Sequence, residues 1–219
     1  MDAVVTIKIN PKARRIKLEI VEDGKVLVTS PPRVPQFILN RFIADHREWI
    51  NKHTNKLKGK VSVVSTDYIY LFGIKYPLVY SSSTISSPGF VLQNTSLVYT
   101  PIAGKTAQLS QRLLLNFLKT TCGAYVLPRT TQIAQLMQVT YKTIGLKEQK
   151  TRWGSCSSRG TLSFNWRLVH FDPKVIDYVI THELAHLVHP NHSRAFWRLV
   201  AQHYPNFASA KKILQQYYW

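Results

Sequence analysis

The chain has 219 residues, with 29 lysines and arginines against 11 aspartates and glutamates, which gives a formal net charge of +18. Its 45% of hydrophobic residues exclude a disordered or fibrous chain and allow one or two packed domains. No segment approaches the roughly 18 consecutive apolar residues of a membrane helix, and the first residues lack the pattern of a secretory signal peptide. The two cysteines, Cys122 and Cys156, exclude a disulfide framework. We therefore expect a cytoplasmic protein without membrane association.

The excess of positive charge, with a pI of about 10.1, favours polyanionic partners such as nucleic acid or phosphorylated small molecules. Basic residues are spread along the chain and are densest between Lys52 and Lys60. Such a cluster is equally typical of a solvated helix end. Charge alone therefore leaves association with nucleic acid as an open alternative.

The N-terminal part, residues 1–105, is predicted to be rich in strands. Alternating apolar and polar residues predict strands over residues 15–20 and 25–29, joined by a turn at residues 22–25. A proline-rich break follows. Apolar residues at helical spacing then predict one long amphipathic helix over residues 36–57, with a basic outer face.

Two hairpins are expected after this helix. One covers residues 68–80 around Gly73, and the other covers residues 91–100 around Asn94. The serine-rich segment between them, residues 81–89, is too short to link independent domains. The pattern changes to helical spacing after residues 103–104.

The second part, residues 106–219, is predicted to hold the chemistry. Its first helix contains the apolar residues between Leu109 and Leu118, and a second helical segment is expected from Pro128 to Met137. Strands are predicted over residues 139–145 and 162–169. Asp172 and Pro173 then have the residue types of a helix cap and a first helical position.

The helix that begins at Pro173 contains the sequence His182-Glu183-Leu184-Ala185-His186, an H-E-x-x-H motif. Two histidines four residues apart lie on one face of a helix, so both imidazoles can reach one ion. The glutamate between them can take a proton from a water molecule activated by zinc. The motif therefore predicts a catalytic zinc site with Glu183 as the general base.

A catalytic zinc site needs a third protein ligand. His189 is seven residues past His182, which places it about 10 Å further along a helix. Pro190 disfavours continuation of the helix, and a turn there could bring His192 back to the ion. His192 is therefore the predicted third ligand. The spacing equals that of the metzincins, but His189 stands where they have glycine and no methionine follows for a Met-turn.

The run Tyr178–Leu187 and its surroundings resemble the YgjP-like metallopeptidase family. The resemblance covers nearly the whole chain and is most specific over residues 151–197, in Thr151–Ser158, Leu162–Leu168, Asn191–Ser193 and Phe196–Trp197. It implies a zincin-like core related to the SprT-like and Wss1-like metalloproteases, with His182, His186 and His192 as zinc ligands and Glu183 as general base. One branch of the family is associated with nucleoside-triphosphate pyrophosphatase activity.

Residues near the motif supply further candidates. Arg152 is the candidate for stabilising the oxyanion, with Asn165 and His170 behind it, and a structural ion pair is its equally weighted alternative. Cys156 is expected to be a small buried hydrophobic residue, because three histidines leave no need for a thiolate ligand.

The strand over Leu162–Val169 is expected, by analogy with zincins, to lie at the edge of the sheet beside the metal and to pair with an extended peptide. Leu162, Phe164 and Asn165 are accordingly the candidate substrate-binding residues.

The predicted fold class is α+β: a zincin-like core, with the motif helix packed on a small sheet, preceded by the strand-rich N-terminal part. The predicted function is a zinc metallopeptidase acting on protein or peptide. Two alternatives stay open. One is a metal-dependent UTP pyrophosphatase, for which the chain has no Walker loop, and the other is a nucleic-acid-binding module with a structural zinc.

Overall fold

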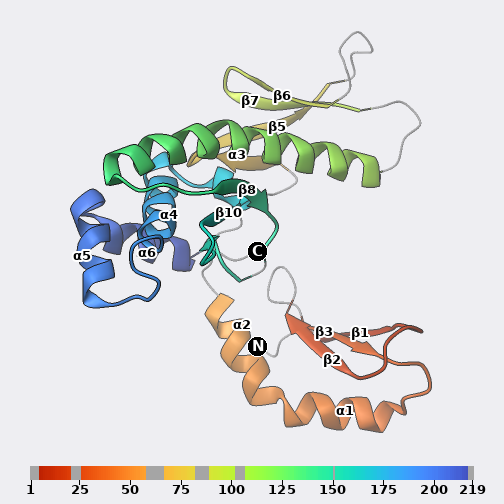
Figure 1. The fold of residues 1–219 in the computed structure, drawn as a ribbon. Coiled ribbons are helices and arrows are strands. Elements are labelled where there is room, and N and C mark those ends of the chain that lie inside the picture. The colour runs from red at the N-terminus through yellow and green to blue at the C-terminus, as the bar shows by residue number, and fades with distance from the viewer. Residues whose placement is uncertain are drawn as a thin grey trace. The chain divides into compact units, whose positions relative to one another are not determined.

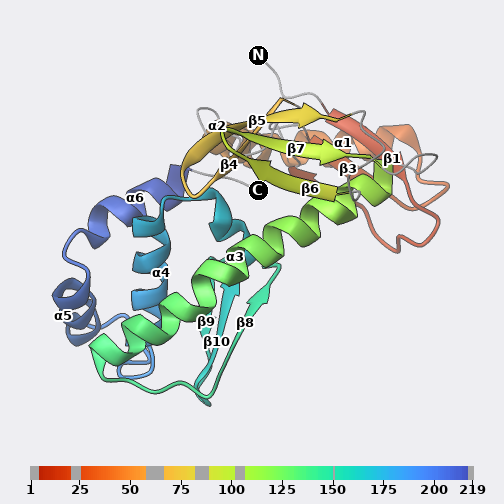
Figure 2. The same cartoon turned by 90° about the horizontal axis from the view of Figure 1, so that it is seen from above.

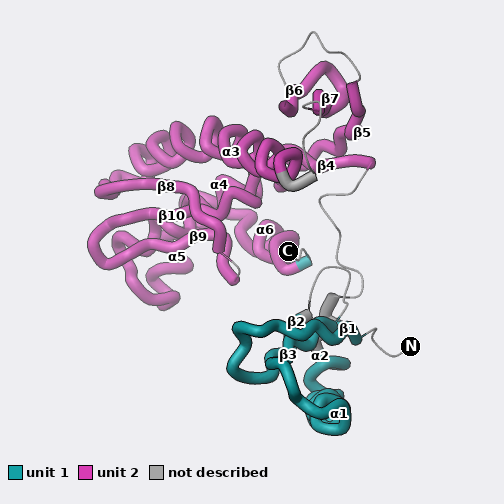
Figure 3. Tube along the Cα trace, turned by 90° about the vertical axis from the view of Figure 1, so that its right-hand side faces the viewer, with its two compact units in different colours: residues 1–62, 216–219 teal, residues 63–215 magenta. Residues whose placement is uncertain are grey.

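The computed structural model describes residues 5–20, 26–57, 67–81, 89–101, 107–149 and 151–216. The chain forms two compact units, residues 1–62 with 216–219 and residues 63–215, shown in Figure 3. Three predicted features lie largely or wholly outside the described residues, namely the turn at residues 22–25, the loop at 81–89 and the change of pattern at 103–104.

The first unit contains a small sheet of three strands, β1 (Val5–Ile9), β2 (Lys17–Ile20) and β3 (Val26–Ser30). β3 is central, parallel to β1 and antiparallel to β2. The two predicted strands correspond to β2 and β3, whereas β1 was not predicted. Val26 and Val28 are fully buried in the core of this unit.

The single long helix predicted over residues 36–57 is wrong. The chain forms α1 (Gln36–Asp45) and α2 (Arg47–Leu57), which are interrupted at His46. The His46 ring nitrogen Nδ1 lies 2.8 Å from the Phe42 carbonyl oxygen, which the His46 backbone N–H also approaches, at 3.2 Å. The ring and the backbone N–H of His46 thus share one carbonyl at the point where the helix is interrupted. Ile50 of α2 is buried with the valines of β3.

The second unit begins with a sheet of four strands in the order β4-β5-β7-β6. Its strands are β4 (Tyr68–Leu71), β5 (Ile74–Tyr80), β6 (Gly89–Gln93) and β7 (Ser96–Thr100). Both predicted hairpins are confirmed. Phe72 and Gly73 have positive φ angles of 51° and 80°, as a tight hairpin turn requires, and Asn94 has a φ of 46° in the second turn.

Helix α3 (Ala107–Met137) is continuous through Pro128, so the predicted division into two helical segments is wrong. The buried residues of α3 lie on the same face of the helix before and after the proline: Leu118, Cys122, Val126, Ile133 and Met137. Packing of this face outweighs the hydrogen bond that proline removes. Figure 2 shows α3 running beside the second sheet of this unit, and it also packs against α4 (Pro173–Ala185).

The second sheet has the order β8-β10-β9, with β8 (Thr143–Lys147), β9 (Gly154–Cys156) and β10 (Thr161–Asn165). β10 pairs in parallel with β8 and antiparallel with β9. The strand predicted over residues 162–169 therefore ends early. Asn165 accepts a hydrogen bond from the Arg167 N–H at 3.2 Å and starts a 3₁₀ helix, η2 (Trp166–His170). The strand predicted over residues 139–145 begins only at Thr143.

The remaining helices follow in sequence, as Figure 1 shows: α4, α5 (Arg194–His203) and α6 (Phe207–Gln216). The predicted start of α4 is confirmed, since the Asp172 carboxylate accepts a hydrogen bond from the Lys174 N–H at 2.8 Å. Arg129 of α3 forms a salt bridge with Asp177 of α4, with the closest atoms 2.7 Å apart. α4 is thus fixed against α3 as well as the sheet.

The β4–β7 sheet belongs to the same compact unit as this helical region. The Phe72 N–H donates to the Val169 carbonyl at 2.7 Å, and the His170 ring nitrogen Nδ1 lies 2.7 Å from the Tyr70 carbonyl oxygen. The division between the units, after residue 62, therefore differs from the predicted boundary at residue 105. The mixed α+β class itself is confirmed.

Candidate metal centre

The predicted metal-binding residues lie at the end of α4 and in the loop that follows it. His182 and Glu183 are in the last turn of the helix, and His186 is its C-cap. The chain then turns, and Ser193 caps α5 by accepting a hydrogen bond from the Phe196 N–H at 3.3 Å. This turn returns His192 to the two histidines of the motif.

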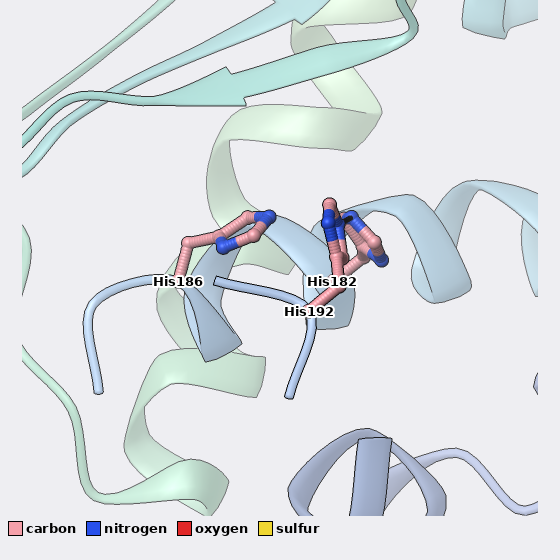
Figure 4. A group of neighbouring side chains, drawn as sticks. All are labelled: His182, His186 and His192. Atoms are coloured by element: carbon pink, nitrogen blue, oxygen red, sulfur yellow. Dashed lines mark hydrogen bonds between the residues drawn. The ribbon is translucent and has the colours of Figure 1, made fainter. Parts of the chain in front are cut away.

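The three histidines form a compact cluster. One ring nitrogen of each of His182, His186 and His192 lies within 4.8 Å of the others. The Nε2 atoms of His182 and His192 are 3.0 Å apart. Figure 4 shows the imidazole of His186 directed toward the other two. The predicted set of ligands is therefore brought together from two segments, the helix and the loop.

The loop residue His192 is held in place by aromatic side chains of α5. Its ring stacks on Trp197, with centroids 5.7 Å apart and an interplanar angle of 23°. The buried Phe196 contacts all three histidine rings, with centroid distances of 4.9 Å to His182, 4.5 Å to His186 and 4.9 Å to His192. These contacts restrict the imidazole orientations before any ligand binds.

The local environment keeps the motif histidines neutral. Burial lowers the pKa of His182 to about 3, with further lowering by positive charge on His186, His192 and Lys211. Burial also lowers the pKa of His186, while the hydrogen bond between its Nδ1 and the His189 carbonyl, 3.2 Å long, raises it. Neutral imidazole is the form that binds a metal ion.

These residues fit a zinc ion. Three neutral imidazoles form the donor set typical of a catalytic zinc site. Among the described residues, the buried Nδ1 of His182 has no hydrogen-bond partner, and its Nε2 faces another imidazole nitrogen. A cation held by this cluster would satisfy the Nε2 nitrogens of His182 and His192, which face each other 3.0 Å apart.

Glu183 lies beside the cluster and is only 6% exposed. Burial raises the pKa of its carboxyl group to about 8, and the positive charge of Arg152 opposes this shift. The carboxyl group packs against the backbone of β9 at Gly154. A Cβ atom on that residue would stand 2.6 Å from the Glu183 Oε1, closer than real contacts allow. Glycine is therefore required for this position of the carboxyl group.

A cavity of about 810 Å³ opens at the histidine cluster. One wall is formed by β9 and the turn after it, a second by α4, and a third by Lys211, Leu214 and Gln215 of α6. Its size is in the range of pockets that enclose small ligands or several residues of a peptide.

The predicted site residues separate into two groups. The structure brings together His182, His186, His192 and Glu183, and Arg152 lines the same cavity. The three candidate substrate-binding residues lie elsewhere, since Leu162, Phe164 and Asn165 are fully buried.

The expectation of an edge strand at Leu162–Val169 is wrong, because β10 is the central strand and both of its sides are paired. Asn165 has a positioning function instead, since its side-chain amide donates to the Gln149 carbonyl at 2.7 Å and the Arg152 carbonyl at 3.2 Å.

The edge strand beside the metal centre is β9, which sequence analysis missed. The Asn165 N–H donates to the Trp153 carbonyl and the Ser157 N–H to the Thr161 carbonyl, which sets the alternation of the antiparallel ladder. By that alternation, the backbone N–H and C=O groups of Gly154 and Cys156 point away from β10.

The sequence did not reveal β9 because a three-residue strand gives little periodicity to detect. The sequence signal was the Trp-Gly-Ser-Cys run before a turn at residues 157–160.

The other residues near the site differ in how well they match their predictions. Cys156 is half-buried rather than buried, and burial and the nearby Glu183 charge raise its pKa. His170 is buried away from the cavity, where burial lowers its pKa to about 4. Sequence analysis assigned no function to Lys211, because only the turn between α5 and α6 brings α6 to the cavity.

Comparison with known proteins shows the family of this chain. A model of the YgjP-like metallopeptidase domain matches residues 14–217. The chain belongs to the YgjP-like family. It is accordingly a metal-dependent hydrolase of the metallopeptidase type, as the resemblance in the sequence implied.

Two solved structures are also similar, each at 24% identity. The metallopeptidase zymogen abylysin of Pyrococcus abyssi matches 40% of this chain and 87% of its own, with a TM-score of 0.36. The zymogen jannalysin of Methanocaldococcus jannaschii matches 42% and 95%, with a TM-score of 0.38. A search of curated proteins gives no significant match. Among the helices in the described ranges, none combines the length and hydrophobicity of a membrane span.

Proposed function

We propose that the chain is a zinc-dependent peptidase, with His182, His186 and His192 as the zinc ligands and Glu183 as the general base. The observation that supports this most directly is the convergence of three imidazoles within 4.8 Å beside a buried glutamate, in one open cavity. When bound, zinc supplies a Lewis acid that polarises the scissile carbonyl and lowers the pKa of a water molecule toward about 7.

Glu183 is suited to moving the proton. Its carboxyl group lies against β9 and lines the same cavity as the three histidines, where it can accept a proton from a water molecule. It would take the proton of the attacking water and return it to the leaving amine. Arg152 is the group we propose for the oxyanion, because its positive charge is felt by Glu183 and it lines the same cavity.

The substrate backbone would pair with β9. This strand has one unpaired side in the described sheet, and Gly154 and Cys156 direct their peptide groups toward it. An extended peptide that adds to this edge passes directly beside Glu183. This replaces the earlier expectation that the strand at residues 162–169 binds the substrate. Nucleic-acid association and a cytoplasmic location stay predictions from composition.

The test compares the wild type with Glu183→Gln, both loaded with zinc. We expect the variant to lose about 10²- to 10⁴-fold in peptide cleavage, the usual contribution of a general base, and to keep its zinc. A mixture of unstructured proteins and quenched fluorescent peptides serves as substrate, and UTP is assayed in parallel. Release of pyrophosphate from UTP without peptide cleavage would overturn the proposal. If Glu183→Gln also loses its zinc, Glu183 helps to hold the ion, and its assignment as a general base that is not a ligand is wrong.

A further inference from the structure

One wall of the cavity is formed by a single face of α6. Lys211, Leu214 and Gln215 all line the cavity, and residues three and four positions apart lie on the same side of a helix. Leu214 is nearly buried, at 8% exposed, whereas Lys211 and Gln215 are exposed. The wall therefore has an apolar base with a cationic and an amide group above it.

The ammonium group of Lys211 has a defined place beside the histidine cluster. Its Nζ lies 5.1 Å from the centroid of the Trp197 ring, a cation–π contact. Trp197 is itself stacked between His192 and Phe207, the latter with centroids 5.3 Å apart at 25°. The positive charge of Lys211 also reaches His182, whose pKa it helps to lower. The same aromatic stack thus positions a metal ligand and this cation.

The charges around the cavity do not neutralise Lys211. Among the described residues that line it, Arg152 is a second cation and Glu183 is the single acidic residue. Glu183 packs against β9 and has its own task in the proposed chemistry. The α6 wall therefore presents an uncompensated positive charge to whatever occupies the cavity.

We infer that Lys211 and Gln215 form a subsite for a carboxylate group of the peptide substrate, so that the enzyme selects acidic peptides. This inference rests on the proposed peptidase function. Lys211 supplies a point charge, Gln215 an amide N–H donor, and Leu214 an apolar surface for the methylene groups of a bound glutamate. The carboxylate comes either from an aspartate or glutamate side chain or from the C-terminus of the peptide.

The test uses pairs of quenched fluorescent peptides that differ only in glutamate against glutamine at positions flanking the scissile bond. The first set is acetylated and amidated, so that only side chains carry charge. A second set has neutral side chains and a free or an amidated C-terminus. In one of the two sets, we expect kcat/KM at low salt to be about tenfold higher for the peptide with the carboxylate than for its neutral partner. This preference should be reduced at high salt.

The variants are Lys211→Glu and, as a matched control, Lys212→Glu. Lys212 is the next residue of α6, is exposed, and does not line the cavity. Lys211→Glu should abolish the preference and favour lysine-containing peptides instead, whereas Lys212→Glu should keep the wild-type preference. Equal cleavage of paired peptides by the wild type, or the same loss in both variants, would overturn the inference.

A binding measurement separates this inference from the proposed function. Fluorescence anisotropy of the same peptides with zinc-loaded Glu183→Gln protein needs no turnover. A carboxylate preference that disappears when Lys211→Glu is added supports the subsite even if the cleaved bond is not in these peptides. Peptide cleavage by the wild type without any charge preference leaves the peptidase intact and removes the subsite. If the protein neither cleaves nor binds these peptides, both the subsite and the proposed peptidase function are overturned.

Discussion

The helical side of the metal centre and its strand side are built in different ways. On the helical side, His182, Glu183 and His186 have fixed relative positions because they lie within five consecutive residues at the end of α4. On the strand side, the residues that meet Glu183 come from β9, whose position depends on pairing with β10. The comparison shows that local spacing places the proposed ligands, whereas sheet order decides which backbone lies beside the proposed general base.

The largest effect is expected from the loss of His192, the histidine of the cluster that lies outside the H-E-x-x-H motif. His192→Ala should lower zinc affinity by more than about 100-fold, because removing a ligand costs more than removing a ligand's hydrogen-bond partner. His189→Ala should bind zinc like the wild type. It keeps the backbone carbonyl that faces His186 Nδ1, and its side chain is outside the ligand cluster.

Competition with a chromophoric chelator measures both affinities. Equal loss of zinc in the two variants would mean that the loop as a whole, rather than the His192 imidazole, holds the ion.

The second prediction tests the contact between the two sides. Gly154→Ala places a methyl group 2.6 Å from Glu183 Oε1, so the carboxyl group must move. Misplacing a catalytic group by about 1 Å can cost about 100-fold, and we expect a loss of that order in kcat/KM, with zinc affinity little changed. Gly145→Ala in β8 is the matched control, because a Cβ there meets nothing within 4 Å.

Zinc content and peptide cleavage of the two glycine variants are measured side by side. If Gly154→Ala keeps full activity, the position of Glu183 against β9 has no function in the reaction.

A third prediction concerns stability rather than activity, through His170 at the end of η2, away from the cavity. Burial lowers its pKa to about 4 from 6.5, with the Arg167 charge acting in the same direction and the hydrogen bond to Tyr70 opposing it. The unfolded chain therefore binds a proton between pH 6.5 and 4 that the folded protein does not, so stability falls as pH falls through this window. The loss is at most about 3 kcal/mol.

Urea unfolding of the metal-free protein at pH 7, 6 and 5 tests this against His170→Asn, which retains a donor for the Tyr70 carbonyl. The variant should lose less stability than the wild type on acidification. Parallel pH profiles would show that His170 does not contribute. His182 has a lowered pKa in both proteins, so its contribution cancels in the difference.

Much of the local structure followed from the sequence. The hairpin turns at Gly73 and Asn94 were predicted because few residues adopt a positive φ angle, and both residues do so here. The start of α4 was predicted from Asp172 because its carboxylate can reach an N–H of the first helical turn. Such features depend on contacts between residues a few positions apart.

The errors concern helices whose continuity differs from what residue propensity indicates. Pro128 indicates a break by its own chemistry, yet α3 continues because Val126 and Thr130, on either side of it, are fully buried. Residues 36–57 have helical spacing throughout, yet the helix is interrupted at His46, whose ring contacts the Phe42 carbonyl. In both cases the propensity of a residue was weaker than the contacts it makes.

The family followed from the sequence alone, and so did the proposed chemistry: the two motif histidines, the glutamate between them, and a third histidine after a proline that disfavours the helix. These are consequences of helical spacing and residue type. The three-dimensional structure was needed to show that β9 rather than β10 is the edge strand, that Gly154 touches Glu183, and that Lys211 lines the cavity. Alternation along a strand shows which residues share a face, but the order of strands in a sheet depends on pairings that no single strand encodes.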